Sequence, residues 1–289
     1  MTVAIASGKG GTGKTTVATG LALSLAEGNA EREGNQVQLL DCDVEEPNSH
    51  FFLHMDKERE NKVTVTVPRI DQETCTACGK CVKVCRFNAL ALIGDEVLVF
   101  DQLCHSCGGC TLVCPVDAVT EQPREIGEME SFRRNGIHLV HGRLNIGEPM
   151  SPPLIRTVKK EKDRNKTVLI DSPPGTTCPM VVSVQGADFC ILVTENTPFG
   201  LHDLELSVEV LQTLKIPMGV VINRADIGTS DVEVFCQEQQ IPVLLRIPFS
   251  EEIARAYSSG RPFVEVLPEY KQTFRNMFAE IEKMAEATW

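Results

Sequence analysis

Short apolar runs rich in β-branched residues alternate along the chain with segments of helical periodicity. The first run, residues 2–6, predicts a strand, and residues 15–27 predict an amphipathic helix after it. Later strands are expected at residues 37–40, 137–140, 167–170, 189–194, 218–222 and 243–247, and later helices at 201–214 and 269–287. Because strands that alternate with helices form parallel sheets covered on both faces, the pattern predicts an α/β fold with a doubly wound, mostly parallel sheet. Such a sheet binds its ligand at the carboxyl ends of the strands.

Two stretches interrupt this alternation. Residues 27–35 form a polar connection in which Glu-Gly-Asn occurs twice, and we interpret it as a surface loop. Residues 63–122 are rich in cysteine, and the strand and helix pattern resumes only after Pro123. We therefore expect one α/β domain formed by residues 1–62 and 123–289, with residues 63–122 as an inserted domain.

The composition is that of a folded protein, since 42% of the 289 residues are hydrophobic. Asp and Glu number 40 against 28 Lys and Arg, and the formal net charge of −12 argues against a nucleic-acid-binding surface. No apolar run is long enough for membrane insertion, and the first strand begins too early to leave room for a signal peptide. Clustered cysteines in such a chain favour the reducing cytoplasm over a secreted disulfide scaffold.

A glycine-rich segment lies between the first strand and the first helix. Residues 8–15 satisfy the phosphate-binding pattern G-x-x-x-x-G-K-S/T in the structural context that this pattern requires. Backbone N–H groups of such a loop surround phosphate oxygens, Lys14 reaches the β- and γ-phosphates of ATP, and the Thr15 hydroxyl binds Mg²⁺. The predicted phosphate-binding residues are Gly8, Gly10, Gly11, Thr12, Gly13, Lys14, Thr15 and Thr16.

An additional lysine, Lys9, makes this loop similar to the deviant Walker A box of the MinD, ParA, Mrp and nitrogenase iron-protein family, K-G-G-x-G-K-S/T. The resemblance covers residues 1–62 and 123–289. It implies an ATPase that forms an ATP-dependent homodimer, in which Lys9 crosses the interface to the phosphates of the partner subunit. One departure is Ser250, because the family usually has an aspartate two residues after the proline that follows the last strand.

Three further segments resemble motifs of that family. Asp43, in Asp-Cys-Asp, resembles the switch I aspartate that orients the attacking water, and positioning of this kind is what phosphoryl transfer needs most. Asp171 and Gly175, in Asp-Ser-Pro-Pro-Gly, resemble switch II, where the aspartate holds the Mg²⁺ shell through water and the glycine N–H senses the γ-phosphate. Asn223 and Arg224 resemble the pair that contacts adenine.

Eight of the twelve cysteines form two runs with the spacing C-x2-C-x2-C-x3-C, and the second repeats the first at an offset of 29 residues. This is the pattern of bacterial ferredoxins with two [4Fe-4S] clusters, in which the fourth cysteine of each run binds the other cluster. The expected ligand sets are Cys75, Cys78, Cys81 and Cys114 for one cluster, and Cys104, Cys107, Cys110 and Cys85 for the other. Structural zinc is the alternative. Arg86 stands where a proline is common and removes no ligand.

Weaker features have more than one interpretation. Cys178 follows switch II, where the nitrogenase iron protein also has a cysteine that binds a cluster. This resemblance suggests that two Cys178 thiols meet across a dimer axis. The simpler interpretation is that Cys178 is a small residue packed in the core. His138 and His141 are interpreted as residues that flank a strand. The helix at 269–287 has an apolar stripe without the basic polar face that anionic membranes attract, so we expect it to pack against the sheet.

Two functions are compatible with these motifs. In the first, nucleotide-driven switching of an ATPase dimer gates electron transfer through two [4Fe-4S] clusters to an unidentified redox partner. In the alternative, the chain is an ATP-dependent carrier that delivers clusters to an acceptor protein. Mrp-like carriers use a C-x-x-C near the end of the ATPase domain, and none occurs after Cys114, which favours electron transfer. Spatial organisation in the manner of MinD or ParA is disfavoured, since the basic surface or membrane-binding tail that it needs is not evident.

Overall fold

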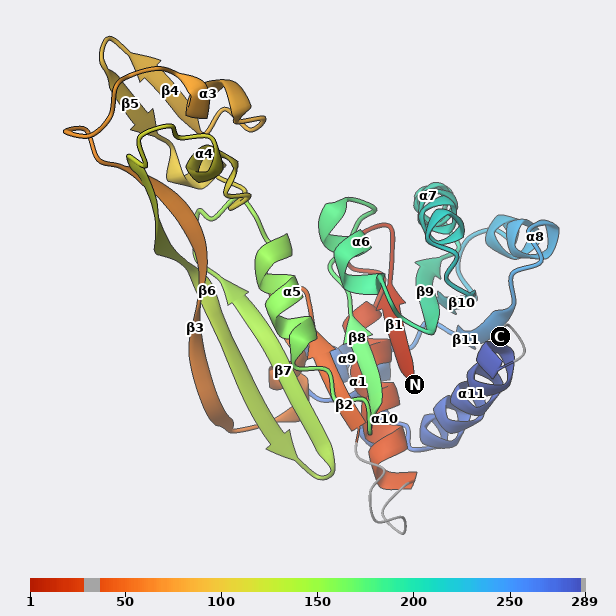
Figure 1. The fold of residues 1–289 in the computed structure, drawn as a ribbon. Helices are drawn as coiled ribbons and strands as arrows, with labels where there is room; N and C mark the ends of the chain where they lie inside the picture. Colours follow the sequence, from red (N-terminus) through yellow and green to blue (C-terminus); the bar gives the residue numbers. More distant parts are fainter. Residues whose placement is uncertain (29–36, 287–289) are drawn as a thin grey trace. The chain divides into compact units, whose positions relative to one another are not determined.

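The computed structural model describes residues 1–28 and 37–286. The chain divides into two compact units, the larger formed by Met1–Asn61, Met129–Arg143 and Ser151–Trp289, and the smaller by Lys62–Glu128 and Leu144–Met150 (Figure 1). The smaller unit contains the cysteine-rich residues 63–122 and also includes residues 123–128 and 144–150, which the sequence pattern does not assign to it. Most of the surface loop predicted at residues 27–35 lies outside the described residues.

A mostly parallel sheet forms the centre of the larger unit, with the strand order β11-β10-β9-β1-β8-β2-β7-β6-β3 (Figure 1). Its strands are β1 (Thr2–Ala6), β2 (Val37–Asp41), β3 (Lys57–Ile70), β6 (Val119–Arg134), β7 (Ile137–Leu144), β8 (Thr167–Asp171), β9 (Phe189–Glu195), β10 (Met218–Asn223) and β11 (Val243–Ile247). All pairs from β11 to β7 are parallel. The predicted α/β fold and each predicted strand are therefore confirmed, although β7 is longer than expected.

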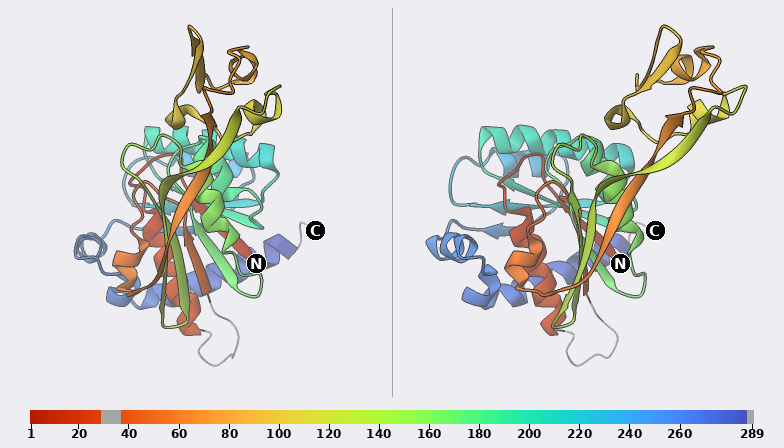
Figure 2. Two further views of the ribbon diagram at one scale, coloured as in Figure 1. Left: turned by 60° about the vertical axis from the view of Figure 1, so that its left-hand side comes forward. Right: turned by 90° about the vertical axis from the view of Figure 1, so that its left-hand side faces the viewer.

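Helices cover both faces of this sheet (Figure 2). One face carries α1 (Lys14–Gly28), α10 (Phe263–Val266) and α11 (Glu269–Glu286), and the other carries α5 (Pro152–Lys160), α6 (Cys178–Val184) and α7 (Pro198–Leu214). In the central strands β1, β2, β8, β9 and β10, successive residues point to opposite faces and both sets are buried, so these strands are apolar nearly throughout. The remaining helices of this unit are α2 (Ser49–Leu53), α8 (Asp231–Glu238) and α9 (Glu251–Ser258).

The C-terminal helix α11 packs within the domain, mainly on α1 rather than directly on the sheet as predicted. Phe274 and Ile281 are fully buried in the same core cluster as α1 and the sheet, and Arg275 Nε donates to the carbonyl oxygen of Ser24 on α1 at 2.9 Å. Its described part ends at Glu286, so the last predicted residue lies outside the described residues. In the described part of the chain, no helix is both long and apolar enough to cross a membrane.

Two long strands, β3 and β6, were missed by the sequence pattern. The connection between β6 and β7 consists of Asn135 and Gly136, which have φ values of 47° and 79°. Two consecutive residues with positive φ form the tight turn that joins antiparallel strands, so β6 runs antiparallel to β7. Both β3 and β6 continue along the chain from the larger unit into the smaller one.

The smaller unit contains an antiparallel hairpin of β4 (Leu90–Ile93) and β5 (Glu96–Val99), the short helices α3 (Lys80–Val84) and α4 (Gly109–Leu112), and a 3₁₀ turn at Asp101–Leu103. The cysteine repeat is also a repeat of backbone conformation. Positive φ angles recur at the same offset as the cysteines, in the pairs Ala77 and Ser106, Gly79 and Gly108, and Asn88 and Asp117.

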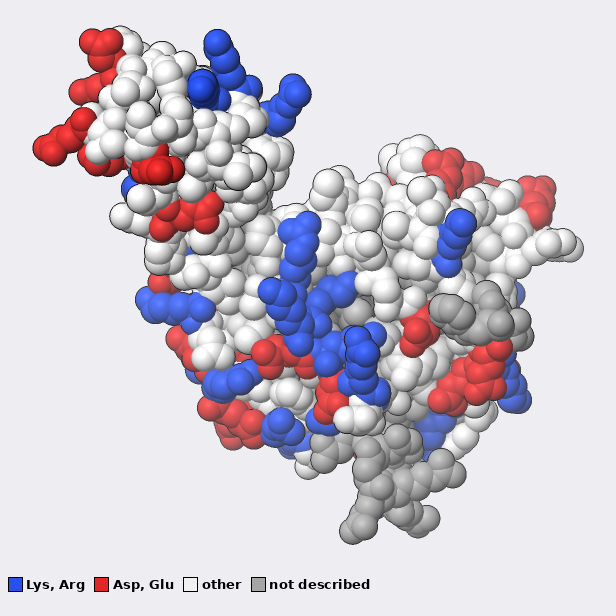
Figure 3. Space-filling model, in the orientation of Figure 1, with Lys and Arg blue, Asp and Glu red and all other residues white. Residues whose placement is uncertain are grey.

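Charge is distributed unevenly in spite of the acidic total. Figure 3 shows Lys and Arg side chains gathered over the part of the larger unit that contains α5. Residues 156–166 carry six basic side chains against two acidic ones, and Arg156, Lys160 and Arg164 are exposed. The acidic net charge therefore does not describe every face of the molecule.

Candidate functional site

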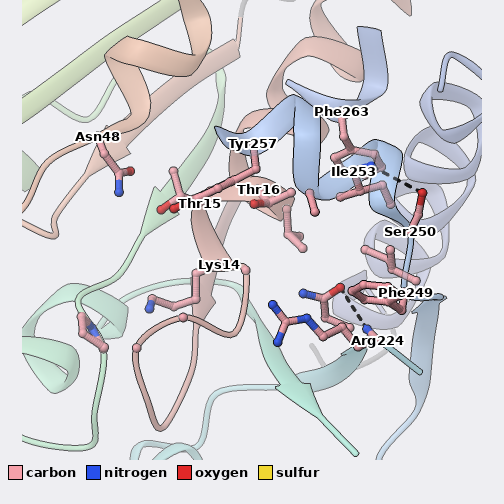
Figure 4. A pocket seen from close by; sticks show the side chains of 18 of the residues that line it. Lys14, Thr15, Thr16, Asn48, Arg224, Phe249, Ser250, Ile253, Tyr257 and Phe263 are labelled. Atoms are coloured by element: carbon pink, nitrogen blue, oxygen red, sulfur yellow. Dashed lines mark hydrogen bonds between the residues drawn. The ribbon is translucent and has the colours of Figure 1, made fainter. Parts of the chain in front are cut away.

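A cavity of about 400 Å³ lies at the carboxyl edge of the sheet in the larger unit. The phosphate-binding loop and the start of α1 form one side of it, with Lys14, Thr15 and Thr16 in view (Figure 4). Asp43 and Pro174 come from the loops after β2 and β8. The cavity is thus formed by the loops that follow parallel strands, where a doubly wound sheet binds its ligand.

Two glycines of the loop are required by close approaches. A Cβ atom at Gly8 would lie 2.2 Å from the backbone oxygen of Asp203 on α7. Gly13 has a φ of 98°, and a Cβ there would lie 2.7 Å from Nδ2 of Asn223. The same Nδ2 donates to the carbonyl oxygen of Thr12 at 2.9 Å. The two glycines therefore allow the phosphate-binding loop to pack closely against α7 and against Asn223 at the end of β10, and they also leave room for phosphate.

Thr15 and Asp171 meet beside the loop. The Thr15 hydroxyl donates to Oδ2 of Asp171 at 2.7 Å, and Oδ1 of Asp171 is buried with no hydrogen-bond partner among the described residues. Burial raises the pKa of Asp171 well above its usual range, and the nearby Asp41 adds to this effect while Lys14 opposes it. A hydroxyl and a carboxylate with a free oxygen are donors that suit a hydrated Mg²⁺ ion, which would relieve the cost of the buried charge.

Asp43 lines the cavity from the loop that follows β2. Burial and, to a smaller extent, the nearby Asp41 raise the pKa of Asp43 to about 7, although Lys14 opposes the rise. A carboxyl group with this pKa changes its charge near neutral pH, which suits a group that positions water beside a phosphate.

The raised pKa of Asp43 predicts a pH-dependent stability. A carboxyl whose folded pKa of about 7 exceeds the unfolded value of 3.8 loses stability as pH rises between the two values. We expect Asp43→Asn to gain stability relative to wild type from pH 5.5 to 7 and to level off by pH 8. Chemical denaturation of the nucleotide-free protein measures this, with exposed Glu45→Gln as the control. A difference that does not vary with pH would contradict the prediction.

The far side of the cavity is apolar and comes from the C-terminal part of the chain. Phe249 follows β11, and Tyr257 and Phe263 belong to α9 and α10 (Figure 4). Arg224 also lines this side and pairs with Glu195 at 3.0 Å. An apolar wall with a few polar groups suits a nucleobase. Sequence reasoning did not identify the three aromatic residues, because their spacing is that of ordinary core residues.

Ser250, the departure from the family pattern, has a structural role. Its hydroxyl accepts the backbone N–H groups of Glu252 at 3.2 Å and Ile253 at 3.4 Å, and so caps α9. Serine and aspartate are both favourable capping residues, so the replacement preserves the start of this helix.

Five of the predicted nucleotide-site residues do not line the cavity. They are Gly8, Lys9, Thr12, Asp171 and Gly175. Lys9 is half-buried and borders a separate small cavity beside α7. The N–H of Gly175 donates to the carbonyl oxygen of Ser7 at 3.0 Å, so it must leave this hydrogen bond to contact a phosphate. The remaining predicted residues, Gly10, Gly11, Gly13, Lys14, Thr15, Thr16, Asp43, Asn223 and Arg224, line the cavity together.

The smaller unit brings its eight clustered cysteines into two cavities. The first is lined by Cys75, Cys78, Cys81 and Cys114, and the second by Cys85, Cys104, Cys107 and Cys110. Each cavity thus takes three cysteines from one run and the fourth from the other. This is the arrangement expected if the fourth cysteine of each run binds the cluster of the other run.

Backbone groups point at four of these sulfur atoms. The N–H groups of Ala77, Ser106, Ala89 and Ala118 lie between 3.2 and 3.4 Å from Sγ of Cys75, Cys104, Cys85 and Cys114, respectively. Ala77 and Ser106 adopt positive φ values of 53° and 54°, a conformation that costs such residues free energy. Backbone donors directed at sulfur stabilise thiolates, so the donor arrangement fits metal-bound cysteine.

The four other cysteines differ in exposure. Cys42, Cys190 and Cys236 are buried, and burial raises the pKa of each thiol. Cys178 is exposed at the first position of α6, so the interpretation of Cys178 as a packed core residue is wrong. Its side chain is held at the surface because α6 begins there, after the rigid Pro-Pro-Gly turn.

Comparison with known proteins agrees with this architecture. The family described as the CobQ/CobB/MinD/ParA nucleotide binding domain matches residues 3–263. The chain belongs to this family. An uncharacterized protein of Methanocaldococcus jannaschii is 30% identical over 271 residues, covering 92% of both chains. The cytosolic Fe-S cluster assembly factor NUBP1 homolog of Brugia malayi is 24% identical over 307 residues, covering 98% of this chain and 79% of that protein.

The fold of this CobQ/CobB/MinD/ParA domain also resembles solved structures. The septum site-determining protein MinD of Pyrococcus horikoshii, determined in complex with Mg-ADP, superposes with a TM-score of 0.58 at 22% identity and covers 99% of this chain. The match to the family spans the phosphate-binding loop, Asp43, Asp171 and the aromatic wall of the cavity. It ends before α11. Nucleotide binding by this domain follows from family membership.

Proposed function

We propose that this protein is an ATP-hydrolysing switch that forms an ATP-dependent homodimer and gates electron transfer through two [4Fe-4S] clusters. The observation that carries the iron–sulfur part is the sharing of eight cysteines between two cavities in interleaved sets of four. A zinc site needs only one set of four neighbouring ligands, and nothing in zinc chemistry requires the exchange of the fourth cysteine.

The nucleotide part of the proposal assigns a role to each group in the large cavity. Lys14 neutralises the β- and γ-phosphates, and Thr15 and Asp171 hold Mg²⁺, which supplies charge neutralisation in phosphoryl transfer. Asp43 orients the attacking water. Asn223 and Arg224 contact the base from the other side.

The path of the chain supports a coupling between the nucleotide cavity and the cysteine-rich unit. Strands β3 and β6 belong to the sheet that carries the nucleotide cavity, and both continue without interruption into the unit with the cysteines. The clusters supply one-electron transfer when bound, and their backbone N–H donors and burial set the potential. A change in the strands that accompanies nucleotide binding would reach the cluster ligands through covalent structure.

Anaerobic purification and electron paramagnetic resonance test this function. We expect about eight iron and eight sulfide per chain, and a spectrum of the reduced protein that changes when ATP is added. Rapid mixing of the reduced protein with an oxidised acceptor dye then measures onward transfer with and without ATP. Zinc in place of iron, or transfer that is indifferent to ATP, would contradict the proposal.

A second candidate is an ATP-dependent carrier of clusters. It is favoured by the relatives named as cytosolic Fe-S cluster assembly factors, which align with nearly the whole chain, and by the exposure of Cys78 and Cys107. Incubation of the iron-loaded protein with an apo-ferredoxin separates the two functions. Loss of iron to the acceptor indicates a carrier, whereas redox cycling with iron retained indicates electron transfer.

A further inference from the structure

A row of buried ionisable groups crosses the carboxyl edge of the sheet in the larger unit. In the strand register, Asp41 on β2 lies beside Asp171 on β8 and, on its other side, beside His141 on β7. All three residues are buried. His141 extends the row to β6, because its Nε2 lies 2.7 Å from Oε2 of the buried Glu130. The row begins at Asp171, which accepts the hydroxyl of the cavity residue Thr15, and ends on a strand that continues into the smaller unit.

Asp41 holds the loop between β2 and α2. Its carboxylate accepts the backbone N–H of Asp43 at 3.1 Å, and those of Asn48 and Ser49 at 3.2 and 3.1 Å. Asp41 therefore binds backbone groups near both ends of the loop at residues 42–48. Asp43, within this loop, lines the cavity. The loop is linked through the same carboxylate to the start of α2, where His50 follows Ser49.

His50 connects α2 to the strands beyond β2. The centroid of its ring lies 4.8 Å from that of His141, in an edge arrangement, and 5.5 Å from that of Phe132, nearly stacked. Phe132 and His141 are themselves 5.0 Å apart. We refer to His50, His141 and Glu130 as the histidine cluster. The cluster joins the short helix α2, which follows the cavity residue Asn48, to β6 and β7 by direct contact.

One end of the histidine cluster is firmly held and the other is not. Glu130 lies 3.1 Å from Lys57 and 3.5 Å from Arg143. Burial acts to raise the pKa of Glu130, but hydrogen bonds from His141 and Lys57 outweigh it and lower that pKa. By contrast, Nδ1 of His50 and Nδ1 of His141 are buried without a hydrogen-bond partner within the described residues. A buried nitrogen without a hydrogen-bond partner destabilises this arrangement of the two rings relative to one in which the nitrogen is hydrogen-bonded.

We propose that the histidine cluster couples the loop at residues 42–48 to strands β6 and β7, so that a nucleotide in the cavity changes these strands. The inference rests on the proposed function, since nucleotide binding is the event that moves the loop. His50 is the positioning residue at the moving end, and Glu130 is the anchor. Strand β6 then carries the change toward the cysteine-rich unit.

Hydrogen–deuterium exchange of the full chain tests this coupling. The probe is the segment 129–144 of β6 and β7, measured with and without Mg²⁺ and a non-hydrolysable ATP analogue. We expect the nucleotide to change exchange in this segment of the wild type, and His50→Ala to abolish the change while the phosphate-binding loop is still protected. Ser131→Ala is the matched control, because Ser131 contacts His138 at 3.0 Å on the opposite face of the same strand pair. It should retain the full change.

Several outcomes overturn the coupling. One is a nucleotide-dependent change that persists in His50→Ala, and another is a change that disappears equally in Ser131→Ala. Should His50→Ala fail to fold, Glu130→Gln removes the anchoring charge with little change of shape, and the change in the segment should again be lost. A wild-type chain without nucleotide protection of the phosphate-binding loop contradicts the proposed function itself. Protection of that loop without any response in β6 and β7 contradicts only the coupling.

Discussion

Lys14→Ala is expected to lower the affinity for Mg-ATP by a factor between about 30 and about 4,000, because truncating a buried charged partner costs about 2–5 kcal/mol. Lys14 is 6% exposed and lines the cavity from the start of α1, so no other cation of the loop can take its place. Isothermal titration of the anaerobic protein with a non-hydrolysable ATP analogue measures the effect. The melting temperature of the nucleotide-free variant shows whether the fold is kept.

Lys9→Ala is the matched control for this experiment. Lys9 belongs to the same loop but does not line the nucleotide cavity in the described part of the chain. We expect it to retain nucleotide affinity within a few-fold and to lose the ATP-dependent dimer in sedimentation experiments. Equal loss of affinity in the two variants would contradict the separate roles of the two lysines.

Pairs of cysteine substitutions are expected to lose either one cluster or both, according to which cavity the cysteines share. Cys75 and Cys114 line the same cavity, so Cys75→Ala/Cys114→Ala should keep about four of about eight iron atoms. Cys75 and Cys85 line different cavities although they belong to one run, so Cys75→Ala/Cys85→Ala should retain almost no iron. Iron and sulfide analysis after anaerobic purification gives the answer directly.

The reverse result would indicate that each run binds its own metal, and the interleaved sets would then be wrong. Cys178→Ala serves as the control, since Cys178 is exposed on α6 in the other unit. We expect its iron content to be unchanged. A loss of iron in this variant would instead support a cluster shared across a dimer.

Local patterns accounted for a large part of what is now known of the fold. The phosphate-binding loop, the strands and the two cysteine runs were all identifiable because each depends on residues close in sequence, through spacing, glycine conformation and apolar periodicity. Family membership agrees with the nucleotide-binding loop. The identity of the metal on the cysteines stays a prediction.

Other features depended on which segments the fold brings together. Strands β3 and β6 were missed because much of each is polar and exposed, so neither shows the apolar run of a buried strand. The turn at Asn135 and Gly136 was the available signal. Likewise, the interpretation of His138 and His141 as residues that flank a strand is wrong, since both lie within β7 and contact β6, through Ser131 and Glu130 respectively.

By itself, the sequence determined the chemistry that this protein carries: a loop built for phosphate and eight thiols at cluster spacing. Tertiary structure alone decided which distant groups meet, including the aromatic wall opposite the phosphate-binding loop and the contact of His50 with His141. The physical reason is that spacing along the chain fixes local backbone geometry. Contacts between distant segments depend instead on strand order and register, which no short pattern encodes.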